Sequence, residues 1–243
     1  MKKKNDTPRI STSIGVSLLV LVTMLTPWSQ SSFASWDLSS LAKLSLIHIE
    51  TVNRSNQARE ILRENYHPDL IRGQEVEKVH AFIHEWVRTN LQGKWKVHTA
   101  EIASTIIQES AKRDLDPIFL VAVIDQESKF HPMALGTSGE RGLMQLMPKT
   151  AKWVAQKYEI PWQGDKTRRD PVMNIRIGAA YLAHLRDRFK NQGVMYLQAY
   201  NMGVSKLNRA IKDNKSPQEY ANRVSKIYRE YYGKLSKQSS PSS

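Results

Sequence analysis

The stretch from Asp116 to Thr150 constrains the fold of this chain more than any other. Asp116 and Pro117 form a helix start, because an Asp side chain can accept hydrogen bonds from the free amides of the first turn and proline fits the first helical position. Residues 118–124 are apolar on every side, which predicts a helix that is buried all round. We therefore expect the rest of the chain to be organised around this helix.

The buried helix ends in a polar group, at Glu127. Helical spacing places Glu127 on the face of Val123 and Ile124, whereas Asp125 points to roughly the opposite side. A glycine-rich loop follows, and Pro148 can begin the next helix. Apolar surroundings disfavour a charged carboxylate and raise its pKa toward neutrality, so Glu127 is a candidate proton donor. The alternative is a Glu at a helix end in contact with solvent, which is the usual situation for an isolated Glu.

The remaining apolar pattern is helical. The four residues Val76, Val79, Ile83 and Trp86 share one helical face, which predicts an amphipathic helix over residues 74–91. Residues 36–52 are compatible with a helix or an extended segment, and we favour the helix. Further helices are expected at residues 100–113, 148–158, 174–189, 195–200, 204–212 and from 217 to about 235, with a connection at 159–170. No convincing strand occurs after residue 97, so the predicted fold class is all-α.

The first 34 residues have the outline of a secretory signal peptide. Basic residues precede an uncharged run at residues 14–25, and Ser32-Phe33-Ala34 offers a cleavage site. This run is shorter than the roughly 20 residues that cross a membrane, so cleavage near Ala34 is preferred to an uncleaved anchor. The chain has no Cys, which excludes disulfides, thiol chemistry and a lipid-modified N-terminal Cys. The predicted location is the periplasm or cell envelope.

The formal net charge of +13 indicates an anionic partner. An exported basic protein fits a cell-wall polymer or a membrane surface, although the charge could also serve solubility alone. Nucleic acid is the competing interpretation, and the export signal and the absence of a nucleic-acid motif argue against it. His80 and His84 have metal-ligand spacing, but Ala81 stands where a zinc-protease motif needs Glu. No metal and no other cofactor is expected.

Three motifs occur in a family-like order: Glu127-Ser128, GLMQ at residues 142–145 and AYN at residues 199–201. Together they resemble the catalytic domain of the soluble lytic transglycosylases, lysozyme-like enzymes that cut the glycan strands of bacterial peptidoglycan. The resemblance covers about residues 98–232 and implies a lysozyme-like catalytic domain over residues 98–235. Residues 35–97 are then a small helical accessory region of unknown role, and residues 236–243 a disordered tail.

The resemblance implies that Glu127 is the single acid and base. It would protonate the linkage between N-acetylmuramic acid and N-acetylglucosamine and then accept a proton while the muramoyl C6 hydroxyl attacks C1, giving a 1,6-anhydro end. The substrate's N-acetyl group would replace a second carboxylate, since Asp125 faces away and Glu140 lies in a mobile-looking loop. Tyr200 is expected to hydrogen-bond Glu127, and Tyr220 to be mainly structural. The expected substrate-binding residues are Gln145, Met144, Met147, Tyr200, Asn201 and Ser128, although the two Met residues fit a packing role equally well.

Two loop positions depart from the family pattern. Gly136 stands where Ser is common, so that either Thr137 or Ser138 supplies the hydroxyl or the contact is missing, and Glu140 stands where a small residue is usual. A late sugar-binding Glu would fall near Ser216. The alternatives are a hydrolytic muramidase on the same fold and a catalytically silent peptidoglycan-binding scaffold. We expect a monomer that binds peptidoglycan rather than nucleic acid and that could dock an envelope protein through residues 35–97. Internal versus terminal cutting stays open.

Overall fold

The computed structural model describes residues 38–72, 74–215 and 217–239, and within these ranges the fold is all-α, as predicted. The only extended pairing there consists of isolated bridges around Arg141. The predicted signal peptide lies outside the described residues. None of the described helices has the length and apolar character needed to cross a membrane. The α-helices are α1 (Leu38–Leu62), α2 (Val76–Asn90), α3 (Thr99–Lys112), α4 (Pro117–Ser128), α5 (Pro148–Lys157), α6 (Asp165–Arg169), α7 (Pro171–Arg188), α8 (Gly193–Met202), α9 (Val204–Lys212) and α10 (Glu219–Ser239).

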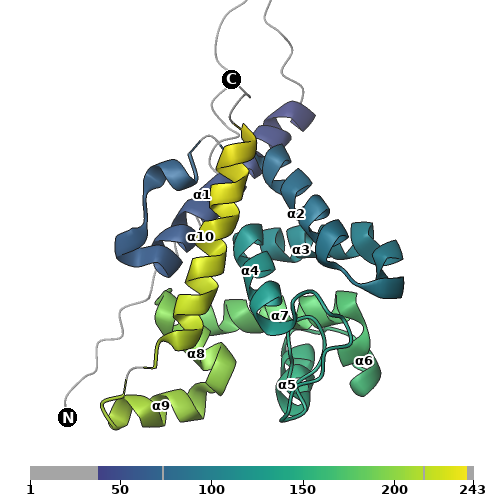
Figure 1. Cartoon of the computed structure of the whole chain (residues 1–243), viewed down its shortest axis with the longest axis vertical. Helices are drawn as coiled ribbons and strands as arrows, with labels where there is room; N and C mark the ends of the chain where they lie inside the picture. The colour runs from purple at the N-terminus through teal and green to yellow at the C-terminus, as the bar shows by residue number, and fades with distance from the viewer. Residues whose placement is uncertain (1–37, 73, 216, 240–243) are drawn as a thin grey trace, which may run out of the picture.

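The central helix is α4, as its sequence predicts. Its residues from Pro117 to Ile124 are all buried, and it packs against α10, α3 and α2. Figure 1 shows α4 in the middle of the molecule, with α10 beside it and α7 crossing below. A helix that is apolar all round is stable only inside such a bundle, because every face must be covered.

The start of α4 is also a tertiary contact. One carboxylate oxygen of Asp116 accepts a hydrogen bond from the Ile118 amide at 2.8 Å, which is the predicted cap. The other accepts hydrogen bonds from the hydroxyls of Tyr228 and Tyr232 in α10. Asp116 is fully buried, and this burial raises its pKa to about 6 although the tyrosines and the charge of Arg54 oppose the rise. The cap of one helix thus fixes the position of another.

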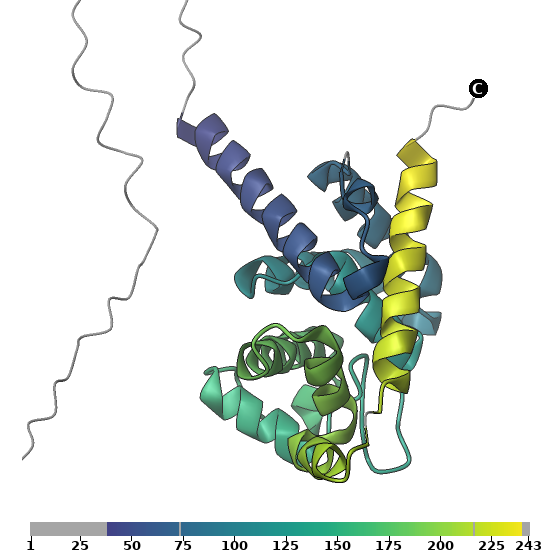
Figure 2. The same ribbon diagram turned by 90° about the vertical axis from the view of Figure 1, so that its left-hand side faces the viewer.

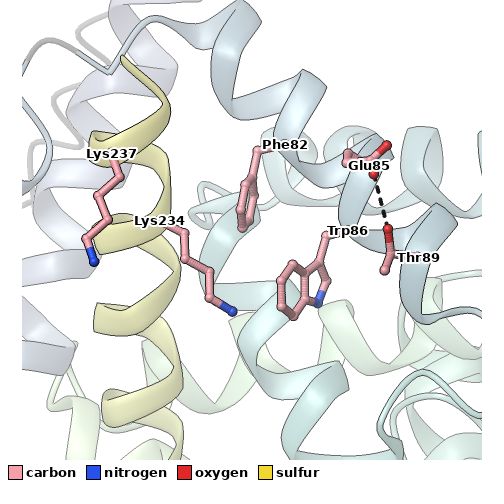
Figure 3. Close-up of a pocket in the computed structure, with 6 residues that line it drawn as sticks. All are labelled: Phe82, Glu85, Trp86, Thr89, Lys234 and Lys237. Atoms are coloured by element: carbon pink, nitrogen blue, oxygen red, sulfur yellow. Dashed lines mark hydrogen bonds between the residues drawn. The ribbon is translucent and has the colours of Figure 1, made fainter. Parts of the chain in front are cut away.

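The helices before α3 are part of the same core. Phe82 and Trp86 of α2 stack with their ring centroids 5.7 Å apart, and Tyr231 of α10 lies 4.5 Å from Trp86. Lys234 extends over the Trp86 ring at 4.2 Å, so that α2 and α10 are joined beside a groove of about 360 Å³ (Figure 3). The buried apolar cluster runs without a break from α1 and α2 into α4 and α7. The proposed boundary near residue 97 therefore does not coincide with an edge of the core.

Three element boundaries differ from the sequence prediction. Helix α1 is a single helix of 25 residues that continues to Leu62, beyond the segment 36–52 for which a helix is favoured. Its N-terminal half extends away from the other helices (Figure 2). The connection at residues 159–170 contains the short helix α6, and α10 continues to Ser239 instead of ending near Leu235.

Candidate active site

Glu127 lies in a cleft of about 500 Å³ at the C-terminal end of α4. The other walls are the loop between α4 and α5, the beginning of α5, and side chains from α7, α8 and α9. Residues that line the cleft include Gly136, Glu140, Gln145, Met147, Tyr181, Tyr200, Asn201 and Lys206. The cleft thus combines two partly buried carboxyl groups, of Glu127 and Glu140, with aromatic and polar side chains that can contact a sugar.

The Glu127 carboxyl is held close to its protonated form. Burial, together with the negative charge of Glu140, raises its pKa from the ordinary value of 4.5 to about 7. A hydrogen bond from the Tyr220 hydroxyl and the positive charge of Arg223 act in the opposite direction. A group with a pKa near the ambient pH can both give and accept a proton, which is the property required of a general acid and base.

Tyr220, at the start of α10, is the tyrosine that hydrogen-bonds Glu127. The prediction that Tyr200 makes this bond is wrong, because the Tyr200 hydroxyl donates to the Met144 carbonyl at 2.8 Å. Tyr200 nevertheless lines the cleft, with its ring 5.5 Å from that of Tyr181. Burial raises the pKa of both Tyr200 and Tyr220 well above 10, so both hydroxyls stay protonated and act as donors.

The loop between α4 and α5 is held by hydrogen bonds to side chains of the later helices α6 and α7. The side chain of the buried Asn174 accepts a hydrogen bond from the Met144 amide at 2.8 Å. It also donates hydrogen bonds to the carbonyls of Arg141 and Arg168, each at 2.9 Å. Gly142 has φ +83°, and a Cβ there would lie 2.4 Å from the Asn174 side-chain nitrogen. This glycine is therefore required by a close approach as well as by its backbone conformation.

A buried arginine supports the same loop. Arg168 donates to the carbonyls of Gly139 and Leu146, each at 2.9 Å, and pairs with Asp165 in α6. Arg168 thus links helix α6 to the loop. The sequence pattern at residues 159–170 did not predict this helix, which helps to position the wall of the cleft.

The structure separates the predicted substrate-binding residues into two groups. Gln145, Met147, Tyr200 and Asn201 line the cleft, and Met147 is 39% exposed. The side-chain nitrogen of Gln145 is used within the loop, where it donates to the carbonyls of Gly142 and Ala134 at 2.9 and 3.2 Å.

Ser128 and Met144 lie beneath the cleft rather than on it. The Ser128 hydroxyl donates to the carbonyl of Leu143 at 2.8 Å and to that of Ile124 at 3.2 Å. Met144 is 0% exposed and belongs to the hydrophobic core. Both residues therefore support the loop from inside.

The two other acidic residues near Glu127 have different positions. Asp125 faces away, as predicted, and accepts a hydrogen bond from Tyr231 at 2.7 Å. Glu140 lines the cleft together with Glu127, which its sequence position gave no reason to expect. Among the residues that the structure describes, no cluster of three or more His, Asp or Glu side chains is arranged to hold a metal ion.

Residues 104–222 match the family model of the transglycosylase SLT domain, and this part of the chain belongs to that family. The fold is the all-α, lysozyme-like fold of lytic transglycosylases. The chain is 35% identical over 96 residues to a putative soluble lytic murein transglycosylase of Haemophilus influenzae, which is 40% of this chain and 16% of that protein.

Two solved structures share the fold. The 70 kDa soluble lytic transglycosylase of Escherichia coli superposes with a TM-score of 0.51 and 21% identity over 65% of this chain and 30% of that one. The inactive glutamate-to-glutamine mutant of the lytic transglycosylase Slt of Pseudomonas aeruginosa gives a TM-score of 0.50 and 23% identity over 84% and 41%. The chain thus covers less than half the length of each of these relatives.

Proposed function

We propose that this chain is a peptidoglycan lytic transglycosylase with Glu127 as its acid and base. The observation that carries the proposal is a protonatable Glu at the end of a buried helix, inside a cleft of a transglycosylase SLT domain. Relatives named as murein transglycosylases point to the same substrate, a glycan strand of alternating N-acetylmuramic acid and N-acetylglucosamine.

In the first step, protonated Glu127 donates its proton to the bridging oxygen as the bond from that oxygen to C1 of N-acetylmuramic acid breaks. The N-acetyl group of the same sugar stabilises the positive charge that develops at C1, in the way that substrate-assisted glycosidases use it. The leaving sugar takes away the proton as a hydroxyl.

In the second step, the ionised Glu127 accepts the proton of the C6 hydroxyl while O6 forms a bond to C1. The product is a 1,6-anhydro end, no water is consumed, and Glu127 regains its proton. The hydrogen bond from Tyr220 stabilises the ionised form between the two steps. Gln145, Met147, Tyr200 and Asn201 would bind the sugars on the cleft walls.

A hydrolytic muramidase is the second candidate, and the position of Glu140 favours it. Two carboxylates in one cleft can divide the work, with one as the acid and the other as the base that activates water. Glu127 and Glu140 line the same cleft. The two reactions differ in their products, because hydrolysis leaves a reducing end that contains the elements of water.

The basic chain and the predicted signal peptide at residues 1–34 agree with an exported protein of the periplasm or cell envelope that acts on this polymer as a monomer. The exposed, projecting half of α1 offers a surface for an envelope partner within the region 35–97.

Mass spectrometry of the products from purified peptidoglycan tests the proposal, with the wild type compared with Glu127→Gln. The matched control is Asp125→Asn, which changes a carboxylate of the same helix that faces α10. We expect wild type and Asp125→Asn to release products lighter than reducing muropeptides by the mass of one water, and Glu127→Gln to release none. Reducing ends would identify the muramidase, and binding without any product from wild type would identify the silent scaffold.

A further inference from the structure

The Glu140 side chain occupies the space above Gly136 in the cleft. A Cβ on Gly136 would lie 2.3 Å from the Glu140 Oε2 atom, 3.0 Å from its Cδ and 3.1 Å from the Gln145 Oε1 atom. No real Cβ approaches an oxygen to 2.3 Å, so a side chain at position 136 and the present position of Glu140 exclude each other. The Glu140 carboxylate thus takes the space on the cleft wall that a side chain at position 136 would fill.

The turn from Gly136 to Glu140 holds this carboxylate in place. The Gly136 amide donates to the Glu140 carbonyl at 2.8 Å, and the Ser138 amide donates to the Oε2 atom at 3.0 Å. From below, the buried Arg168 donates to the Gly139 carbonyl at 2.9 Å. Within the described ranges, the Oε1 atom has no hydrogen bond or ion pair to a protein group. The turn therefore holds the Glu140 carboxylate at the wall of the cleft through one of its two oxygens.

A carboxylate only accepts hydrogen bonds, so this position selects a ligand group that donates them. The proposed glycan substrate offers hydroxyl and amide N–H donors on both of its sugars. Glu127 is engaged by Tyr220 and is reserved for proton transfer, which leaves Glu140 as the acidic group of the cleft that is free to bind a donor.

We propose that Glu140 is a substrate-binding residue whose free carboxylate oxygen accepts a hydrogen bond from a hydroxyl or amide N–H of the sugar bound over Gly136, and that Gly136 is needed to leave room for it. The identity of the ligand rests on the proposed function. The pairing of the two residues rests on geometry alone. The same charge helps to keep Glu127 protonated, which connects binding to catalysis.

The binding experiment uses the Glu127→Gln chain, which cannot turn over, and peptide-free glycan strands from peptidoglycan as the titrant in calorimetry. Adding Glu140→Gln or Glu140→Ala should weaken binding about 10-fold, the usual effect of losing a hydrogen bond to a charged group. The matched control is Glu77→Gln, an exposed carboxylate on α2, which should leave the affinity unchanged. Equal affinities for all variants would overturn the proposal.

Gly136→Ala tests the pairing. In the same background it should weaken binding about as much as Glu140→Ala, because the new Cβ displaces the carboxylate, and the double variant should be no weaker than Glu140→Ala alone. Losses that multiply in the double variant would contradict the shared space. Circular dichroism and thermal unfolding show whether Gly136→Ala is folded, and Glu140→Gln, which adds no heavy atoms, keeps the test valid if it is not.

Turnover separates this proposal from the proposed function. If wild type binds strands without cutting them, the enzyme assignment fails while the binding test of Glu140 still stands. If Glu140→Gln abolishes turnover in the active chain and leaves the affinity in the Glu127→Gln background unchanged, then Glu140 is a base and not a binding residue.

Discussion

The cleft carboxyl of Glu127 makes the stability of this protein depend on pH. Its folded-state pKa of about 7 exceeds the ordinary value of 4.5, so the folded state holds the proton more tightly than the unfolded state does. The stabilising contribution is therefore complete below pH 4.5 and is lost as the pH rises through 7. The rise in pKa corresponds to an upper limit of about 3 kcal/mol.

We expect Glu127→Gln to be more stable than wild type at pH 8, by up to about 3 kcal/mol, because glutamine carries no buried charge. At pH 4 the two proteins should have similar free energies of unfolding. Urea titrations at both values measure the difference, with Glu77→Gln as the control that should change little at either pH. A stabilisation of equal size at pH 4 and pH 8 would contradict a proton-linked origin.

Substitutions of Tyr220 and Tyr200 predict different pH profiles of activity. A general acid must be protonated, so activity should fall as the pH rises above about 7. The Tyr220 hydrogen bond lowers the pKa of Glu127, and Tyr220→Phe should therefore move this decline to higher pH while reducing the maximal rate. Tyr200→Phe removes a bond to the Met144 carbonyl instead and should leave the position of the decline unchanged. Initial rates measured as a function of pH test this prediction. A shift of the decline with Tyr200→Phe but not with Tyr220→Phe would mean that Tyr200, and not Tyr220, is the hydrogen-bond partner of Glu127.

At the scale of the helix, two Asp-Pro starts carry different energetic roles. Asp116 caps α4 while it is buried beneath two tyrosines of α10, whereas the exposed Asp170 caps α7 by accepting a hydrogen bond from the Met173 amide at 2.9 Å. Asp116→Ala should lower the free energy of unfolding by about 3 kcal/mol, because it also leaves two buried hydroxyls unpaired. Asp170→Ala should cost about 1 kcal/mol, the ordinary value of a cap. Chemical denaturation measures both, and equal losses would show that the tyrosine contacts add nothing.

The helix starts also show what a sequence can reveal. The cap and the apolar run of α4 are local patterns, and Glu127 follows from them by helical spacing. The bond from Tyr220 joins residues 93 positions apart in the chain, and no local pattern distinguishes this tyrosine from Tyr200. The sequence around Glu140 does not reveal the contacts that hold its loop, because they come from Asn174 and Arg168 in later helices. Local chemistry was therefore predictable, and the choice of partners was not.

For the whole molecule, the first helices belong to the core that supports the cleft. Helix α1 packs on α8 and α10, and α2 packs on α3 and α4. The Arg186 Nε atom of α7 donates to Glu60 of α1 at 2.8 Å, and both side chains are largely buried. Removing α1 and α2 would uncover apolar surface on α3, α4 and α10 and would leave the Arg186 guanidinium without its carboxylate.

We therefore expect a chain of residues 98–239 to melt at a much lower temperature than a chain of residues 38–239, to bind a hydrophobic dye and to lose turnover of peptidoglycan. A chain of residues 50–239 is the control, because it lacks only the half of α1 that extends from the body, where Leu44, Leu46 and Ile49 are already exposed. This control should keep the melting temperature and the activity of the longer chain, since the core contacts of α1 begin at Arg54, Gln57 and Ala58. If the 98–239 chain melts and cuts as the 38–239 chain does, then residues 35–97 are a separable accessory region, and the cleft is supported by the SLT-family helices alone.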